Sequence, residues 1–128
     1  MTSPPRPGSA WRRSATPTAL DLVAAVLDAM AGIIGHDRVL ARRRHTVTMA
    51  NADLRERELI KLERMTAAVT GELRRRGIGD AEASLAAETG SAVYRVAFQR
   101  WVNAADDLDL RDPISQSFAM LRALIAAH

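Results

Sequence analysis

The fold is decided by the stretch DAEASLAAETGSAVYRVAFQRWVNA, residues 80–104. This stretch has no proline and one glycine, and it is rich in alanine, so it predicts a long helix over residues 80–106. Asp80 is expected to cap the helix, with Glu82 in its first turn. The first half of the helix is small, up to Gly90, whereas the second half carries large side chains up to Trp101.

A second long helix is predicted before it, in ADLRERELIKLERMTAAVTGELRRRG, residues 52–77. Apolar residues recur at helical spacing from Leu59 to Leu73. We expect Asp53 to cap this helix, which would run over residues 54–76. Gly77 offers a left-handed residue at its end.

Three shorter helices complete the prediction. Residues 18–34 are apolar around most of the helix, and residues 37–50 follow after Gly35 and a capping Asp37. Asn51 is expected to break the pattern. Asp112 followed by Pro113 indicates the start of the last helix, since proline is favoured at the first helical position. The fold class is therefore all-α, with five helices.

The N-terminal segment differs in composition. Residues 1–17 hold four of the five prolines, and such a segment is expected to be a disordered tail, with residues 18–128 forming one helical domain. The net charge of +3 belongs to this end of the chain. Arg6, Arg12 and Arg13 are its basic residues, and the remaining fifteen basic residues equal the fifteen acidic ones in residues 21–128. The charge distribution therefore does not favour a nucleic-acid-binding face on the folded part.

The chain has no cysteine, which excludes disulfides and thiolate metal sites. Arg12 and Arg13 before the apolar residues 19–34 loosely imitate a twin-arginine signal, but Asp21 and Asp28 interrupt that stretch. We therefore expect a cytoplasmic protein. No nucleophile–base pair is visible, and His36 and His45 have no acidic partners at ligand spacing, so neither an enzyme, a metal site nor a cofactor is predicted.

The last two helices carry more apolar surface than one copy of the chain is expected to bury. A twofold dimer, in which these helices meet their copies in a four-helix bundle, would cover it. The alternative is a tight monomeric core. The dimer prediction assigns to the interface Ala86, Gly90, Val93, Ala97, Ile114, Phe118, Leu121 and Ile125.

The two long stretches quoted above, followed by DPISQSFAMLRAL (residues 112–124), resemble the C-terminal domain of TetR-like transcriptional regulators. The most similar subgroup is described as binding acyl-CoA-like ligands. Leu54, Arg57 and the arginines at 74–76 match its first long helix, and Phe98 and Trp101 match its second. The resemblance covers about residues 19–127 and rests on helical spacing and on a few Arg and Trp positions. The proline that commonly precedes this first long helix in the family is replaced here by Ala52.

The resemblance implies an effector-binding and dimerisation domain, in which the first four helices enclose a pocket. Flexible or large side chains between helices are the expected lining, together with Arg43 at the mouth: Met30, Ile34, Met49, Leu62, Met65, Tyr94, Phe98 and Trp101. Methionine adapts to varied apolar ligands, and tyrosine adds a polar group. For each residue alone, plain core packing is the alternative. The arginines at 42–44 could pair with an anionic ligand or form a solvated basic face.

The departure from the family lies at the N-terminus. Such regulators begin with a three-helix DNA-binding domain built around a helix-turn-helix, where this sequence has its proline-rich residues. DNA binding is therefore expected only through a missing domain or a full-length partner. A truncated gene, a wrong start and a stand-alone effector domain all remain open. The alternative function is a small helical interaction module that binds a protein partner and no ligand.

Overall fold

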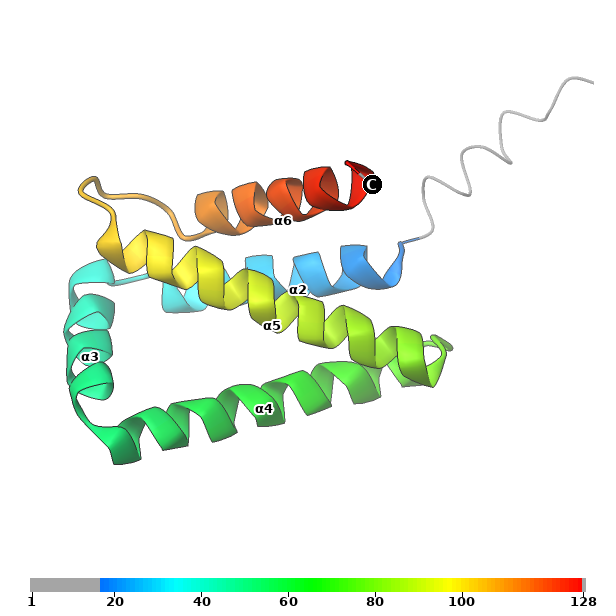
Figure 1. Cartoon of the computed structure of the whole chain (residues 1–128), viewed down its shortest axis with the longest axis horizontal. Helices are drawn as coiled ribbons and strands as arrows, with labels where there is room; N and C mark the ends of the chain where they lie inside the picture. The colour runs from blue at the N-terminus through cyan, green and yellow to red at the C-terminus, as the bar shows by residue number, and fades with distance from the viewer. Residues whose placement is uncertain (1–16, 128) are drawn as a thin grey trace, which may run out of the picture.

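The computed structural model describes residues 17–127, and within them all regular structure is helical (Figure 1). The predicted tail, apart from Pro17, lies outside the described residues. The described helices are α2 (Ala19–Ile34), α3 (Arg38–Ala50), α4 (Ala52–Arg75), α5 (Asp80–Asn103) and α6 (Arg111–Ala126). The predicted all-α class is confirmed.

Short polar side chains set the starts of the first three helices. The Thr18 hydroxyl accepts from the backbone N–H of Asp21, whose carboxylate accepts from the backbone N–H of Thr18, and together they form a capping box. Asp37 caps α3, as predicted. Asn51 both ends α3 and begins α4, since its side-chain oxygen accepts from the backbone N–H groups of residues 53 and 54. The cap predicted at Asp53 was therefore two residues late.

The turn between the two long helices requires a glycine. Gly77 has a φ of 91°, a left-handed conformation that costs other residues strain. The Ile78 backbone N–H bonds the Leu73 carbonyl at 3.1 Å, which closes the end of α4. Asp80 does not cap α5. It lies in the first helical turn and pairs with Arg74 at 3.1 Å, while Gly79 takes the cap position without a side-chain hydrogen bond.

Two further boundaries differ from the prediction. Helix α5 ends at Asn103, because Ala104 is extended and its carbonyl accepts hydrogen bonds from α3. Helix α6 begins at Arg111, before the predicted Asp112 cap, and the Asp109 carboxylate accepts from the Arg111 backbone N–H at 3.0 Å. Proline still lies in the first turn.

The core lies between α2, α5 and α6, which run side by side in Figure 1. Its most deeply enclosed large side chains are Trp101, Val102 and Leu110. Helices α2 and α5 approach closely where Gly90 meets Val23, since a Cβ on Gly90 would lie 2.3 Å from Val23 Cγ1. Small residues of α5 therefore serve this contact within the chain.

Helices α3 and α4 enclose space rather than fill it. Helix α3 stands across the end of the other helices and joins α2 to α4 (Figure 1), yet none of its residues is buried. Helix α4 packs along α5 but buries only Thr66 and Leu73, both in its second half. The first half of α4 therefore leaves a hollow beside α5.

Candidate functional site

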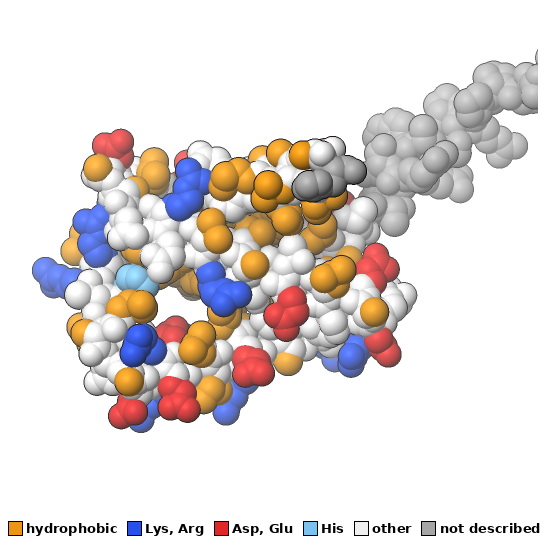
Figure 2. Space-filling model, viewed as in Figure 1, with side chains coloured by type: hydrophobic (Ala, Val, Ile, Leu, Met, Phe, Trp, Pro, Cys, Tyr) orange, Lys and Arg blue, Asp and Glu red, His pale blue; other side chains and the backbone are white. Residues whose placement is uncertain are grey.

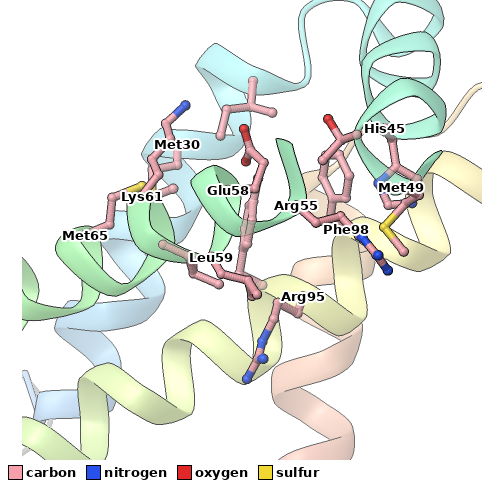
Figure 3. A pocket seen from close by; sticks show the side chains of 14 residues that line it. Met30, His45, Met49, Arg55, Glu58, Leu59, Lys61, Met65, Arg95 and Phe98 are labelled. Atoms are coloured by element: carbon pink, nitrogen blue, oxygen red, sulfur yellow. The ribbon is translucent and has the colours of Figure 1, made fainter. Parts of the chain in front are cut away.

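A cavity of about 350 Å³ occupies this hollow. Its walls come from four helices, and its apolar lining is formed by Met30, Ile34, Met49, Leu59, Leu62, Met65, Tyr94 and Phe98. In Figure 3, Met30 and Met65 lie at one end, and His45, Met49 and Phe98 at the other. The volume falls within the range of about 300–1,000 Å³ that is common for small-molecule pockets.

Charged side chains surround the apolar lining. Arg55, Lys61 and Arg95 are exposed residues of α4 and α5 that line the cavity, and Glu58 is the acidic residue among them. Figure 2 shows the surface hollowed between α3, α4 and α5, with basic and hydrophobic side chains around the opening. Three cations against one carboxylate give the opening a positive balance that favours an anionic group.

The Tyr94 ring is the polar aromatic group of the lining. Burial, and secondly the Glu58 carboxylate nearby, raises the pKa of its phenol above the ordinary value of 10.0. The phenol therefore stays neutral at physiological pH and keeps its hydrogen as a donor.

Aromatic rings form a continuous row at one end of the cavity, where His45, Tyr94 and Phe98 belong to the lining and Trp101 lies behind them. The Phe98 ring lies at the centre, with centroids 5.6 Å from His45, 5.8 Å from Tyr94 and 5.8 Å from Trp101. The His45 ring meets Phe98 edge-on at 68°, a favourable geometry for aromatic pairs. This row joins α3 to α5 through the contact between His45 and Phe98.

Two further hollows adjoin the cavity. One of about 450 Å³ lies toward the α2–α3 junction and shares seven lining residues with it, while Arg44 and Leu40 line its other side. The second is a narrow slot of about 30 Å³ between α2, α4 and α5. The slot continues from the cavity past Met30, Leu62, Met65 and Tyr94, which line both.

The slot contains a pair of hydroxyl groups. The buried Thr66 lies on α4, and Ser91 faces it from α5 with the two oxygens in hydrogen-bond contact. Thr66 Oγ1 also donates to the Leu62 carbonyl at 2.9 Å. Aliphatic side chains and Gly90 form most of the remaining slot wall, so this pair is the polar feature of an otherwise apolar passage.

Seven of the nine residues predicted to bind a ligand line the cavity: Met30, Ile34, Met49, Leu62, Met65, Tyr94 and Phe98. Their binding of a ligand stays a prediction. Trp101 does not line it, because the ring lies behind Phe98 in the core and its indole N–H donates to the Leu108 carbonyl at 2.7 Å. Arg43 is exposed on α3 and lines none of the three hollows described above.

The neighbours of Arg43 have different roles. Arg42 donates to the carbonyls of Val102 and Ala104, at 2.7 Å and 2.8 Å. Arg38, one turn earlier, donates to the carbonyls of Trp101 and Ala104. These two arginines fasten α3 to the C-terminal end of α5, where the partial negative charge of the helix favours cations. Arg44 is the member of the run that lines a hollow.

The sequence-based prediction did not include the charged part of the lining, two polar residues of α3 or the apolar Leu59. The missed residues are His45, Thr48, Arg55, Glu58, Leu59, Lys61 and Arg95. A signal for several of them exists in the sequence. Positions 55, 58, 59, 62 and 65 recur at spacings of three and four, so they share one helical face with the predicted Leu62 and Met65.

Most residues predicted for a dimer interface are enclosed within one chain instead. Ala86, Gly90, Val93, Ala97, Ile114 and Phe118 are buried in the core shared by α2, α5 and α6, Leu121 is half-buried, and Ile125 is 63% exposed. Helices α2, α5 and α6 of one chain bury these six residues against one another, so their place at a dimer interface gains no support from the structure. The exposed apolar side chains on α5 and α6 are Leu85, Val96, Met120, Leu124 and Ile125.

Two further properties of residues 17–127 concern metal binding and membrane spanning. Within this range no three histidine or acidic side chains are grouped as metal ligands would be. No single helix there has the length and apolar character needed to cross a membrane; only α2 and α3 taken together reach that criterion, and they are bent by 99° relative to one another. No protein family model matches the chain, and no curated protein sequence is significantly similar to it.

Proposed function

We propose that this chain is a ligand-binding domain for an elongated apolar molecule with an anionic end, such as an acyl-CoA-like compound or a fatty acid. The observation that carries the proposal is the cavity of about 350 Å³, with its methionine-rich lining and its positively charged opening. An apolar chain would lie between Met30, Leu62 and Met65, which adapt readily to ligand shape. The anionic end would remain near Arg55, which lies toward the Phe98 end of the cavity in Figure 3.

The resemblance to TetR-like regulators extends this proposal to regulation. In such a protein, a ligand between α2, α3, α4 and α5 would favour one arrangement of α2 relative to the dimer. DNA would be read by a helix-turn-helix domain, supplied by a full-length partner or by a segment outside these 128 residues. The proposal assigns no catalytic step to the chain.

A dimer is part of the same proposal, with a corrected interface. Leu124 and Ile125 are 66% and 63% exposed on α6, and Leu85 and Val96 are exposed on α5. A second copy that covers these side chains would remove apolar surface from water. The competing function is a module that uses this same surface to bind a different protein and takes no small molecule.

Isothermal titration calorimetry with dodecanoic acid, dodecanoyl-CoA and dodecanol tests the ligand proposal. The two anionic probes are expected to bind a few-fold more tightly than the uncharged alcohol, because an exposed ion pair contributes about 0.2–1 kcal/mol. Met65→Trp fills the cavity and should abolish binding, whereas Ile60→Trp adds the same ring at an exposed position of the same helix and should not. Circular dichroism checks that both variants fold. Absence of binding by all three probes would refute the proposal, and equal affinity for dodecanol would refute its anionic component.

A further inference from the structure

The narrow slot beyond the cavity has the size of a single chemical end group. Its volume of about 30 Å³ exceeds the roughly 10–15 Å³ that a cavity needs to hold one water molecule, so a small end group fits there. It opens from the cavity between the side chains that line both spaces, among them Met30 and Met65. A ligand chain that follows the cavity away from the charged opening would therefore place its last one or two heavy atoms there.

The donor order of the hydroxyl pair in the slot is part of the inference. A hydroxyl carries one hydrogen and two acceptor lone pairs. Either oxygen can donate in the contact between Thr66 and Ser91, and we assign the hydrogen to Ser91 because Thr66 Oγ1 lies 2.9 Å from the Leu62 carbonyl, which can only accept. Within residues 17–127 the Ser91 side chain makes no other hydrogen bond. Its oxygen therefore retains free lone pairs and presents an acceptor, without a donor, to the slot.

An acceptor of this kind distinguishes between ligand end groups. A terminal methyl group would displace water from the half-buried Ser91 oxygen without replacing its hydrogen bond, which is unfavourable for a polar atom that the ligand then buries. A carbonyl oxygen would also meet only lone pairs. A hydroxyl group would donate its hydrogen and restore the bond.

We infer that the slot recognises a hydroxyl group at the inner end of an elongated apolar acid, and that Ser91 is the residue that selects it. The ligand class is thus a fatty acid or acyl thioester with a terminal hydroxyl. This inference rests on the proposed function, since it requires the cavity to bind the rest of the chain.

Calorimetry with matched probes tests the inference. The probes are decanoic, dodecanoic and tetradecanoic acids, each with its ω-hydroxy counterpart and with the ω-oxo acid, in which an oxo group replaces the hydroxyl at the same end. For the length that fits, the hydroxy acid is expected to bind roughly five- to tenfold more tightly than the plain acid, the effect of one neutral hydrogen bond. The oxo acid should gain nothing over the plain acid.

Two variants identify the group responsible. Ser91→Ala should remove the preference for the hydroxy acid and leave the affinity for the plain acid unchanged or improved. Ser84→Ala is the matched control, since Ser84 lies on the same helix and lines neither the cavity nor the slot. Thr66→Val removes the acceptor that holds the Ser91 hydrogen. That hydrogen then becomes free to donate, so this variant should bind the oxo acid severalfold more tightly than the wild type does.

The outcomes separate the inference from the function beneath it. Equal affinity for the plain and hydroxy acids at every length overturns the inference and leaves the ligand-binding proposal standing. Tighter binding of the oxo acid by the wild type overturns the donor order, and with it the inference. A preference that survives in Ser91→Ala does the same. Absence of binding by all probes overturns the proposed function, and the inference falls with it.

Discussion

Replacing Gly90 by alanine tests the closest contact between α2 and α5. An added Cβ would lie 2.3 Å from Val23 Cγ1 and 3.7 Å from Val23 Cβ. Val23 is only 3% exposed, so it has little room to move aside. The same substitution at Gly71 in α4 meets only the end of the Arg75 side chain, at 3.8 Å, which is an ordinary contact. The two glycines therefore form a matched pair.

The expected magnitude follows from two opposing effects. Alanine stabilises a helix interior over glycine by about 1 kcal/mol. Overpacking a core costs about 1–3 kcal/mol, so Gly90→Ala should destabilise the fold by roughly 0–2 kcal/mol, while Gly71→Ala should stabilise it by up to about 1 kcal/mol. Val23→Ala alone removes two buried methyl groups, at a cost of about 2 kcal/mol.

The double variant decides the issue. With Val23 shortened, the methyl group added at position 90 fills the vacated space. The free energy of unfolding of the double variant should therefore be about 1–3 kcal/mol higher than the two single changes, added together, would give. Urea unfolding followed by circular dichroism measures the free energy of unfolding of the wild type, the three single variants and the double variant. If Gly90→Ala stabilises the protein as much as Gly71→Ala, or if the effects are additive, the close contact between α2 and α5 is refuted.

Three further predictions concern other contacts. Arg42→Ala should lower the free energy of unfolding by about 1 kcal/mol in urea, because the Val102 carbonyl loses its donor and the Ala104 carbonyl keeps only Arg38; no change would contradict that role. The Thr18 backbone N–H and, to a lesser degree, the Thr18 hydroxyl lower the pKa of the Asp21 carboxyl below its ordinary value of 3.8. The ionised carboxylate therefore stabilises the fold above pH 3.8, and this contribution is lost on acidification. Asp21→Asn should therefore flatten the decline of the melting temperature below pH 3.8, and an unchanged slope would contradict this. Leu124→Glu should give folded monomers by analytical ultracentrifugation, whereas Phe118→Asp should unfold the chain; a dimeric Leu124→Glu protein would exclude the corrected interface.

Much of the fold is local and was therefore readable in the sequence. Asn51 and Gly77 mark helix ends through their own side-chain and backbone chemistry, which needs no distant partner. The end of α5 was not readable in this way. It is set by Arg38 and Arg42, which lie about sixty residues earlier and take the carbonyls that further helical turns would have used.

The candidate site also has a part that local sequence patterns predict and a part that they do not. Helical spacing placed Met65 and Tyr94 on inward faces, and both line the cavity. The same spacing placed Trp101 with them, but the loop that follows α5 covers that ring, as the bond to Leu108 shows. The stripe of small residues through Gly90 has the same pattern whether a second copy or the chain's own α2 packs on it. Sequence periodicity predicts that one face of a helix is covered, but it does not predict which helix covers it.

The bonds from Arg38 and Arg42 also have a mechanical consequence. They connect α3, which is one wall of the cavity, to the backbone just before the loop that leads into α6. Since α3 buries no residue of its own, these bonds and the aromatic row are its principal attachments to α5. A ligand that pushed α3 outward would either break these hydrogen bonds or pull on the loop that leads into α6. In the second case the strain would pass toward α6 and the surface that carries Leu124. The two arginines therefore tie the α3 wall of the cavity to the segment from which the loop to α6 departs.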